Sequence, residues 1–598
     1  MAEKVDVIAP ETAITLDGLF QERVRRSASR VAYKNFDEPG GWQDYTWSDV
    51  EKLVARWQAA LEAEGLQPGD RVAIMLRNSV NWIVFDQAAL GLGLVTVPVY
   101  TSDRPENIAY ILCDAGAKLL LLEEPEQWDT FAEVRSQLGG VQRVLSVKTG
   151  SCSDSRVKNV RDWLPATASA VRHVNRDATK LASIIYTSGT TGKPKGVMLS
   201  HRNMLENAYA SLQCFDVVPD DLFLSFLPLS HTLERTAGCY LTMMAGARVA
   251  FARSIGQLGE DLATIQPTIM ISVPRIYERV YGGIKTKLAE GPSFRRKLFE
   301  CAVNVGWARF EHSQGRGPWK WSFLLWPLLE KLVARKVMTR LGGRLRAAVS
   351  GGAALAPEIA RLFVGLGLPI LQGYGLTETS PVVSTNRLED NIPASIGKPV
   401  PGVQVKIGER DALLVKGPNV MLGYWNLPEP TKAMFTADGW LNTGDTARMD
   451  AQGHLFITGR LKEIIVMSNG EKIPPVDMEA AILQDNLFEQ VMIMGEGRPY
   501  LTAFLVINAD QWSKLAAQDS LSSKTGDIAQ DAKAQKYVLE RVQKQIKSFP
   551  GYAKIHRVAV LPEPWTIENG MLTPTMKLKR SKVMEAHKRE FEDMYAGH

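Results

Sequence analysis

The sequence predicts an α/β fold in which helices cover parallel sheets. Short apolar strands are expected at 71–76, 94–100 and 117–124, and helix-like stretches such as 106–115 separate them. Strands that alternate with helices favour parallel pairing, because a parallel connection needs a crossover. Three further strands are expected at 182–190, 344–352 and 368–375, and each runs into glycine. In open α/β sheets, ligands bind at such carboxyl ends.

Length and composition indicate a globular chain of more than one unit. The 598 residues exceed one small core, so we expect one large compound unit and at least one smaller unit. Apolar residues make up 45% and charged residues 23%, which excludes wholesale disorder. The 70 Lys and Arg nearly balance the 65 Asp and Glu, so a globally basic coat is excluded and no nucleic-acid partner is expected.

The cysteine pattern and the apolar segments indicate the cellular location of the protein. The five cysteines are scattered and form no CxxC pair, which argues against a disulfide framework and against a zinc site. The first residues hold no apolar stretch of the kind that a secretory signal needs. The longest apolar run, 323–329, is too short to span a bilayer. We therefore expect a cytoplasmic protein, or one bound peripherally to the inner face of the cell membrane.

A composition change after Thr458 marks a predicted domain boundary. The segment 459–475 is punctuated by glycine, and helices and short strands are expected from there to the end. We place the boundary between 459 and 462. A polar run at 516–536 is interpreted as a solvated helix or an insertion.

The strongest chemical signal is the sequence YTSGTTGKPKGV at 186–197. Its glycines allow backbone N–H groups to turn towards an anion, and its hydroxyls and the lysines Lys193 and Lys195 add donors and positive charge. A Walker loop needs four residues between its glycines and a Ser or Thr after the lysine, whereas here two residues separate the glycines and Pro194 follows Lys193. A Walker loop is therefore disfavoured, and an ordinary Gly/Ser/Thr turn is the plain alternative.

The motif TSGTTGKPKGV resembles the phosphate loop of the adenylate-forming (AMP-binding) superfamily, which contains acyl-CoA synthetases, carrier-protein adenylation domains and beetle luciferases. Six further segments resemble that family's motifs in the family's order. They are LPLSHTLER (227–235), SGGAAL (350–355), QGYGLTET (372–379), GWLNTGD (439–445), GRLKEIIV (459–466) and LTPTMKLKR (572–580). The resemblance spans nearly the whole chain. It implies a large N-terminal domain of stacked α/β sheet subdomains, 1–459, and a small mobile α+β C-terminal domain, 460–598.

The resemblance also implies a reaction in two halves. A carboxylate attacks the α-phosphate of ATP, which gives acyl-AMP and pyrophosphate, and a thiol, usually that of coenzyme A, then takes the acyl group and releases AMP. ATP, Mg²⁺ and coenzyme A are the implied cofactors. Positioning and charge neutralisation are expected to dominate the first half.

By resemblance, the nucleotide is held by residues of several motifs. The β- and γ-phosphates are wrapped by Thr187, Ser188, Gly189, Thr190, Thr191, Gly192 and Lys193. Thr377 holds the α-phosphate, Glu378 binds Mg²⁺, and the ribose is bound by Asp445 and Arg460. One wall of the adenine slot is formed by Gly351, Gly352 and Ala353, and the other by Tyr374, within the segment that includes Gln372, Gly373 and Gly375. Taken singly, Glu378 is also compatible with a solvated loop carboxylate, Tyr374 with a core aromatic and Asp445 with a turn residue.

Four residues carry implied catalytic roles, and one of them is Thr377 at the α-phosphate. His231 lies near the substrate carboxylate and the α-phosphate, although a structural histidine is the alternative. Lys577 is the cation that stabilises the adenylation transition state. No glycine precedes it, unlike the commoner pattern, and Lys579 stays open as the alternative. Lys462 falls at the hinge about which the small domain rotates between the two half-reactions.

The forms of these motifs look most like those of bacterial long-chain fatty acyl-CoA synthetases, so a fatty acid and coenzyme A are the expected partners. Chain length is not readable from the sequence, and a medium-chain or aromatic acid stays open. The alternative is a fatty acyl-AMP ligase that passes the acyl group to a carrier protein. Luciferase chemistry and a non-enzymatic nucleotide-binding scaffold are less favoured, the latter because Lys193, Glu378, Asp445, Arg460 and Lys577 are all present.

The segment 285–346 is strongly basic. It holds 14 basic and four acidic residues, with Trp307, Trp319, Trp321 and Trp326 interleaved. Such a composition suits an anionic membrane surface. A solvated basic face, a homodimer contact and a site for the 3′-phosphate of coenzyme A are the alternatives.

Overall fold

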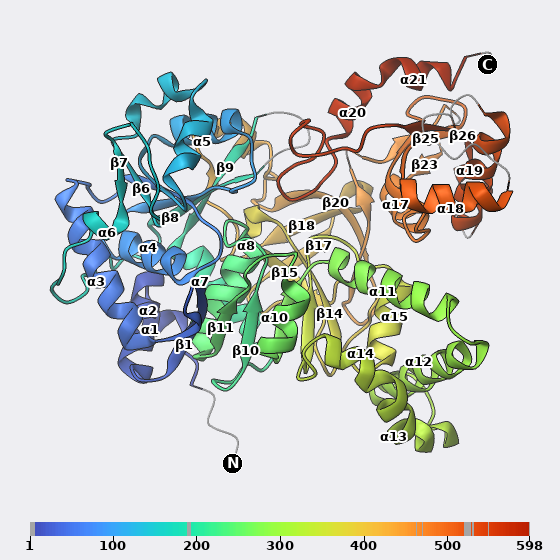
Figure 1. The fold of residues 1–598 in the computed structure, drawn as a ribbon, viewed down its shortest axis with the longest axis horizontal. Coiled ribbons are helices and arrows are strands. Elements are labelled where there is room, and N and C mark those ends of the chain that lie inside the picture. The colour runs from blue at the N-terminus through green and yellow to red at the C-terminus, as the bar shows by residue number, and fades with distance from the viewer. Residues whose placement is uncertain are drawn as a thin grey trace.

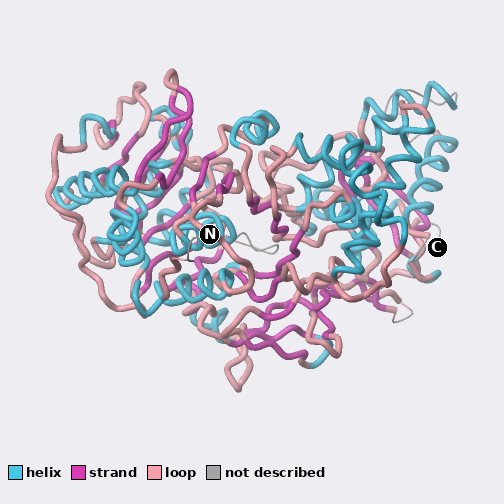
Figure 2. The backbone as a smooth tube through the Cα atoms, turned by 90° about the horizontal axis from the view of Figure 1, so that it is seen from below, coloured by secondary structure: helices cyan, strands magenta, loops and turns pink. Residues whose placement is uncertain are grey.

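The computed structural model describes residues 6–187, 193–461, 463–468, 471–519, 528, 531–547 and 549–596. Its described strands form two large sheets and three smaller ones, and helices pack on the sheet faces (Figure 1). Seen from below, the strands of different sheets stand in separate groups with helices on the flanks (Figure 2). The predicted α/β fold with parallel sheets is confirmed.

The first large sheet has eight strands in the order β19-β9-β8-β4-β3-β5-β6-β7. Pairing from β8 to β7 is parallel, and β8 pairs with β9 antiparallel. The strands are β3 (Arg71–Met75), β4 (Val95–Pro98), β5 (Ala117–Leu122), β6 (Arg143–Ser146), β7 (Val157–Asn159), β8 (Leu181–Thr187), β9 (Lys195–Ser200) and β19 (Gly423–Tyr424). The strands expected at 71–76, 94–100, 117–124 and 182–190 correspond to β3, β4, β5 and β8.

The second large sheet has nine strands in the order β16-β15-β14-β13-β12-β10-β11-β1-β2. Its centre, from β14 to β1, is parallel, and antiparallel strands form both edges. The strands are β1 (Val31–Asp37), β2 (Gly41–Thr46), β10 (Leu222–Ser225), β11 (Arg248–Phe251), β12 (Ile269–Ser272), β13 (Ala347–Ser350), β14 (Ile370–Gly375), β15 (Val382–Thr385) and β16 (Lys398–Pro399). The strands expected at 344–352 and 368–375 are β13 and β14.

One hydrophobic core joins the two large sheets. Apolar residues of both sheets and of the helices between them form a single buried cluster, which includes Trp47, Trp57 and Trp82. These helices are α2 (Leu16–Ser27), α3 (Trp47–Ala63), α4 (Val80–Gly91), α7 (His201–Leu212) and α9 (Leu241–Ala245). Capping boxes begin α3, from Thr46, and α7, from Ser200, and they satisfy backbone N–H groups that a helix start leaves free.

Further helices cover the outer faces of these sheets. The first sheet carries α5 (Pro105–Ala115), and α6 (Val160–Trp163) follows its edge strand. The second carries α10 (Leu258–Ile265), α11 (Pro274–Ala289), α12 (Ser293–Ser313), α13 (Trp326–Leu329), α14 (Arg335–Arg340) and α15 (Pro357–Gly365). In Figure 1, α12 and α13 project from the lower right corner of the molecule.

The third sheet, β17 (Gln404–Ile407), β18 (Ala412–Lys416), β20 (Leu441–Met449) and β21 (Leu455–Arg460), is antiparallel and leads to the C-terminal part. That part contains a two-stranded sheet, β22 (Ile465–Val466) and β23 (Lys472–Ile473), and a three-stranded sheet, β24 (Phe488–Met494), β25 (Leu501–Ile507) and β26 (Ile555–Leu561). Its helices are α17 (Pro475–Ile482), α18 (Ala509–Asp519), α19 (Ala532–Gln545), α20 (Arg580–Ala586) and α21 (Lys588–Asp593).

The C-terminal part has hydrophobic cores of its own. Two buried clusters consist entirely of residues from Ile465 onwards. The proposed boundary at 459/460 falls one residue before the end of β21. The polar run expected at 516–536 includes the end of α18 and the start of α19, and much of the run between them lies outside the described residues. Across the described ranges, no helix is both long and apolar enough to cross a membrane.

Candidate active site

The ends of two parallel strands bring two of the predicted motifs together. β13 and β14 pair with Ser350 opposite Gln372, so the SGG segment begins beside the QGYG segment, which forms the end of β14. After β14 the chain makes a 3₁₀ turn at Thr377–Thr379. Both segments thus lie at the carboxyl ends of neighbouring strands, which is where ligands bind in open α/β sheets.

A short helix from the histidine motif lies against this edge. It is α8 (Thr232–Glu234), and the hydroxyl oxygens of Thr232 and Thr377 are 3.4 Å apart. A Cβ added at Gly351 would lie 3.0 Å from a methyl group of Leu233, so the glycine allows α8 to approach the strand end. α8 continues into a π-helical turn, Arg235–Tyr240, which is a conformation frequent at functional sites.

His231 caps this helix and is held in one tautomer. Its Nδ1 accepts a hydrogen bond from the Leu233 N–H at 3.1 Å, so the neutral ring carries its proton on Nε2. Burial, together with the positive charge of Lys577, lowers the pKa of His231 to about 4. At neutral pH the side chain is therefore an uncharged donor through Nε2.

Asp445 is the centre of a second group of polar side chains. It lies opposite Arg460 in the β20–β21 register, and Arg460 Nε donates to Asp445 Oδ1 at 3.0 Å. The Tyr374 hydroxyl donates to the other oxygen, Oδ2. Burial and the Asp445 carboxylate raise the pKa of Tyr374. Burial of Arg460 lowers its pKa, but the negative charges of Asp445 and Glu463 have the larger effect, so the pKa is raised.

Glu378 is fixed by its own neighbours. Its Oε1 accepts from the Tyr424 hydroxyl at 2.7 Å, and its carbonyl accepts from the Met421 N–H at 2.9 Å. Burial and the Glu378 carboxylate raise the pKa of Tyr424. The described residues contain no group of three or more His, Cys, Asp or Glu side chains suited to a metal ion. A divalent cation at Glu378 would therefore need other ligands, such as substrate phosphates.

Lys577 extends from the C-terminal part into this region. Its ammonium lies within electrostatic range of Glu378, Asp445, Arg460 and Glu463. Lys577 also lowers the pKa of His231, so the two motifs are neighbours although 346 residues separate them. Burial of the ammonium and then the charge of Arg460 lower the pKa of Lys577, against the pull of the carboxylates. The residue as a whole is nevertheless exposed, so the desolvation is partial.

Lys579, the alternative, has different neighbours. The charges that act on it are those of Arg104, Asp103 and Lys582. The turn before Lys577 is tight: the Lys577 N–H donates to the Thr573 hydroxyl at 3.0 Å, and Met576 has a φ of 61°. This left-handed conformation favours glycine, although methionine occupies it here.

The flanks of the phosphate loop lie nearby, whereas Ser188, Gly189, Thr190, Thr191 and Gly192 are outside the described residues, as is Lys462. Thr187 ends β8 and pairs with Lys195. The ammonium groups of Lys193 and Lys195 lie 5.1 Å from the ring centres of Tyr110 and Tyr424, respectively. The Tyr424 hydroxyl also donates to Glu378, so Tyr424 contacts both the phosphate-loop flank, through Lys195, and the 3₁₀ turn.

Some predicted residues have local structural partners. The Gln372 side chain donates to the Pro393 carbonyl and accepts from the Leu355 N–H at 3.0 Å, so its amide is already engaged. A Cβ at Gly375 would lie 2.0 Å from the Pro381 carbonyl oxygen. Any side chain would clash there, so close packing is sufficient to require glycine at this position. Gly352 has a φ of 81°, and Ala353 is exposed beside it. Gly373 packs against β15.

Sequence reasoning missed three residues of this region. Thr232 and Glu463 each lie within a quoted motif, and attention to every polar side chain of those motifs would have found them. Tyr424 lies 46 residues from Glu378 and in none of the motifs, so no local signal indicated it.

Two family models match the chain. Residues 20–425 match the AMP-binding enzyme model, and residues 462–598 match the model for the C-terminal domain of AMP-binding enzymes. The chain belongs to the AMP-binding enzyme family. The resemblance stated from the motifs is confirmed.

Named relatives of this AMP-binding enzyme share most of its length. The protein named long-chain-fatty-acid--CoA ligase FadD15 of Mycobacterium bovis is 31% identical over 579 residues, which cover 96% of each chain. The Arabidopsis thaliana protein named long-chain-fatty-acid--[acyl-carrier-protein] ligase AEE15, chloroplastic, is 28% identical over 92% of this chain and 82% of its own.

Solved structures of similar fold also cover the whole AMP-binding enzyme. The A domain of a carboxylic acid reductase from Segniliparus rugosus, in complex with AMP and a co-purified carboxylic acid, has a TM-score of 0.77 at 22% identity over 99% of this chain and 97% of its own. The anthranilate CoA ligase AuaEII, in complex with anthranoyl-AMP, has a TM-score of 0.74 at 18% identity over 97% and 98%. At these identities the likeness establishes the fold, including the large N-terminal and smaller C-terminal parts.

Proposed function

We propose that this AMP-binding enzyme is an ATP-dependent long-chain fatty acid:CoA ligase. In the first half-reaction, a carboxylate oxygen of the acid attacks the α-phosphorus of ATP, and pyrophosphate leaves with the bonding electron pair. In the second, the coenzyme A thiolate attacks the acyl carbonyl carbon and AMP leaves. The products are acyl-CoA, AMP and pyrophosphate.

One observation carries the proposal most directly. Lys577 lies within electrostatic range of Glu378, Asp445 and His231, although the four residues come from four separate motifs. A cation held near carboxylates and an uncharged histidine donor suits the charge that develops when a carboxylate displaces pyrophosphate. The similarity to proteins named long-chain-fatty-acid--CoA ligases supports the choice of acid and thiol.

The nucleotide is assigned to residues of the N-terminal domain, proposed as 1–459, and to Arg460, the first residue of the proposed C-terminal domain. The β- and γ-phosphates are assigned to Thr187, Ser188, Gly189, Thr190, Thr191, Gly192 and Lys193, and the α-phosphate to Thr377. The base is assigned to Gly351, Gly352, Ala353, Gln372, Gly373, Tyr374 and Gly375. The ribose is assigned to Asp445 and Arg460. Gln372 would act through its backbone, because its side-chain amide is engaged elsewhere. Asp445 has acceptor capacity beyond its bonds to Tyr374 and Arg460, since a carboxylate offers about four lone-pair sites.

Glu378 is the proposed protein ligand of Mg²⁺. Tyr424 donates to Oε1, and Oε2 has no such fixed partner among the described residues. A single carboxylate combined with substrate phosphates and water is how Mg²⁺ is usually held. When bound, the ion supplies positive charge to the phosphates. Tyr424 then orients the carboxylate.

The catalytic roles follow from charge and position. Lys577, from the C-terminal domain proposed as 460–598, stabilises the adenylation transition state, and His231 donates from Nε2 to an oxygen of the acid or of the α-phosphate. Lys577 is preferred to Lys579 because only its ammonium is influenced by Glu378 and Asp445. Lys462 is the proposed hinge for the rotation that follows adenylation.

A second candidate is a fatty acyl-AMP ligase that transfers to a carrier protein. It is favoured by the similarity to a relative named long-chain-fatty-acid--[acyl-carrier-protein] ligase. The first half-reaction is the same in both proposals. They differ in the thiol, which is free coenzyme A in one and the phosphopantetheine arm of a carrier protein in the other.

We also propose that the enzyme works at the inner face of the cell membrane, because its acyl substrate partitions into lipid. The 14 basic residues of 285–346 support this location. The experiment for the function itself uses one preparation without membranes. Acid-dependent ATP–pyrophosphate exchange and thioester formation with coenzyme A are followed from acetate to oleate. Both should peak with long-chain acids; exchange without thioester would redirect the search to a carrier protein.

A further inference from the structure

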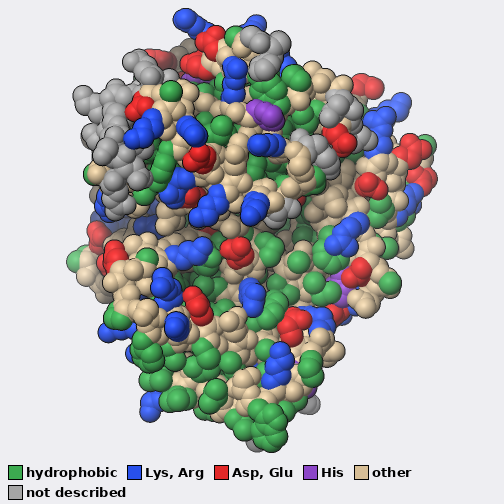
Figure 3. Space-filling model, turned by 90° about the vertical axis from the view of Figure 1, so that its right-hand side faces the viewer, with side chains coloured by type: hydrophobic (Ala, Val, Ile, Leu, Met, Phe, Trp, Pro, Cys, Tyr) green, Lys and Arg blue, Asp and Glu red, His purple; other side chains and the backbone are tan. Residues whose placement is uncertain are grey.

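A large share of the exposed apolar surface gathers on one projection of the chain. Of the 17 large hydrophobic side chains that are exposed among the described residues, seven lie within 294–332. They are Phe294, Trp319, Trp321, Leu324, Leu325, Leu328 and Leu332, and we call them the apolar tip. In Figure 3, hydrophobic side chains gather at the lower end of the molecule, where Figure 1 places α12 and α13. Patches of this kind mark interaction sites.

The helical run at 321–340 carries apolar residues on two sides. It consists of a 3₁₀ turn (Trp321–Leu325), α13, a π turn (Glu330–Ala334) and α14. One side, with Trp326, Leu329 and Val333, packs into the core of the second large sheet. Leu324, Leu328 and Leu332, spaced by four residues, form a second stripe that is 67%, 57% and 41% exposed. A helix that serves only as a cover for its own core is polar on its outer face.

Basic side chains surround the apolar tip. Lys320, Lys331, Arg335 and Lys336 are exposed on or beside the helical run, and Arg295, Arg296 and Lys297 are exposed at the start of α12. Acidic groups are few: Glu330 lies 3.9 Å from Arg335, and Glu300 is exposed on α12. A second copy of the chain would bring this positive surface against itself in a two-fold dimer. An anionic surface is electrostatically complementary to it.

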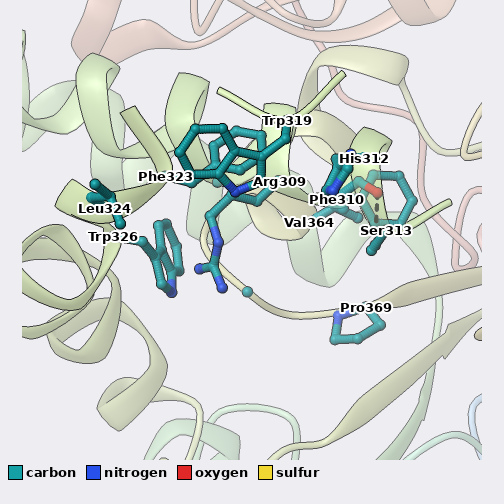
Figure 4. Close-up of a pocket in the computed structure, with 12 residues that line it drawn as sticks. Arg309, Phe310, His312, Ser313, Trp319, Phe323, Leu324, Trp326, Val364 and Pro369 are labelled. Atoms are coloured by element: carbon teal, nitrogen blue, oxygen red, sulfur yellow. Dashed lines mark hydrogen bonds between the residues drawn. The ribbon is translucent and has the colours of Figure 1, made fainter. Parts of the chain in front are cut away.

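A pocket lined by Arg309 and by aromatic side chains adjoins the apolar tip. Its volume is about 590 Å³, and its lining includes Trp319, Phe323, Leu324 and Trp326 around Arg309. Figure 4 shows the Arg309 guanidinium beside the Trp326 ring, whose centre is 4.8 Å away. Arg309 makes no hydrogen bond or ion pair with any described residue. Its donors are thus free to meet an anionic group at the rim of apolar walls.

We infer that α12 and the helical run 321–340 form a docking surface for an anionic lipid bilayer. The apolar tip enters the boundary between headgroups and acyl chains, the surrounding lysines and arginines lie at the headgroup level, and Arg309 binds a lipid phosphate. Tryptophan beside basic residues is typical of this interface. The inference deepens the proposed membrane location and rests on it.

The test measures flotation of the full chain with vesicles of phosphatidylcholine alone or with added phosphatidylglycerol. Wild type should float with the anionic vesicles. Leu324→Glu/Leu328→Glu should lower the partition coefficient about tenfold or more, because two charges would enter the boundary. Val174→Glu/Met449→Glu, which adds the same charge at exposed positions outside the projection, should change it less than about threefold.

Two further variants separate the contributions of the surrounding lysines and of Arg309 to vesicle binding. Lys320→Gln/Lys331→Gln/Lys336→Gln should lower binding to anionic vesicles about a hundredfold, at about fivefold for each basic residue, and leave binding to neutral vesicles unchanged. Arg309→Gln should weaken binding to anionic vesicles alone. Trp321→Ser, at a side chain that is 80% exposed, gives an independent measurement if the double leucine variant does not fold.

The inference is overturned if both leucine and tryptophan variants float like wild type, or if the control variant loses as much binding as they do. It is also overturned if sedimentation velocity reveals a dimer that Leu324→Glu/Leu328→Glu abolishes, because a second copy would then cover the tip. Thioester formation from oleate without vesicles separates the two proposals. Its retention by non-floating variants supports docking, and its absence from wild type would contradict the proposed function instead.

Discussion

Arg460 and Asp445 face each other across two antiparallel strands, with Arg460 Nε 3.0 Å from Asp445 Oδ1. The Tyr374 hydroxyl donates to the second carboxylate oxygen. The pair joins two of the motifs, and Arg460, the last residue of β21, is the first residue of the proposed C-terminal domain. The proposed ribose site at Asp445 is therefore linked directly to Arg460, where the chain leaves the N-terminal part.

Asp445→Asn should raise the KM for ATP more than it lowers kcat. The substitution removes the charge that Arg460 meets and replaces one carboxylate oxygen with a donor, which costs about 1.5–3 kcal/mol, or roughly ten- to a hundredfold. Tyr374→Phe removes one neutral donor and should cost about three- to tenfold. Steady-state kinetics with ATP as the varied substrate checks both. An unchanged KM in Asp445→Asn would contradict the ribose assignment.

Lys462→Pro should separate the two half-reactions. Proline fixes φ near −65° and prevents the backbone change that a hinge needs. The variant should retain ATP–pyrophosphate exchange within about threefold and lose most thioester formation, as in other steps limited by domain motion. Lys462→Ala, which removes the same side chain but leaves φ free, is the control. Equal loss of both half-reactions in the proline variant would contradict the hinge.

The buried His201 should make stability depend on pH. Its Nδ1 accepts from the Leu16 N–H at 3.1 Å, and burial lowers its pKa to about 4 from the ordinary 6.5. Between these values the unfolded chain binds a proton that the folded chain does not. The contribution of His201 is therefore complete above pH 6.5 and is lost as the pH falls to about 4, which amounts to about 3 kcal/mol.

His201→Asn provides the matched comparison, because its side-chain oxygen can accept from the Leu16 N–H without titrating. Denaturant unfolding of both proteins between pH 4 and 7 measures the difference. The free energy of unfolding should fall less steeply with acidification in the variant. Parallel curves would contradict the assignment of that pH dependence to His201.

The turn before Lys577 should accept glycine. Met576 has a φ of 61° and an exposed side chain, so it adopts the left-handed conformation without compensating burial. Met576→Gly removes about 1 kcal/mol of local strain and should keep adenylation at or above wild type. Met576→Val places a β-branched residue there and should slow it. Equal rates of ATP–pyrophosphate exchange in all three proteins would show that this conformation does not affect Lys577.

Much of the fold was predictable because buried parallel strands form short continuous apolar runs. The runs at 71–76 and 117–124 became β3 and β5 within two residues. Partner choice was not predictable: β1 pairs with β11 across more than 200 residues, and β19 joins β9 from a comparable distance. Such pairs depend on the global arrangement of the sheets, which no local pattern encodes.

The candidate site was likewise only partly predictable from the sequence. Neighbours within a motif, such as Thr377 and Glu378, were visible in the sequence. The contact of Tyr424 with Glu378 and the different charge neighbours of Lys577 and Lys579 depend on how distant segments pack. The two lysines differ by only two positions, and their surroundings, rather than the motif, distinguish them.

Lys577→Met and Lys579→Met, compared by acid-dependent ATP–pyrophosphate exchange, test the central claim most directly. If Lys577 stabilises the adenylation transition state, its replacement should slow exchange about 10²–10³-fold, and replacement of Lys579 should slow it less than about fivefold. Preformed acyl-AMP should still react with coenzyme A in both variants. Exchange at the wild-type rate in Lys577→Met, or an equal loss in Lys579→Met, would contradict the proposed site.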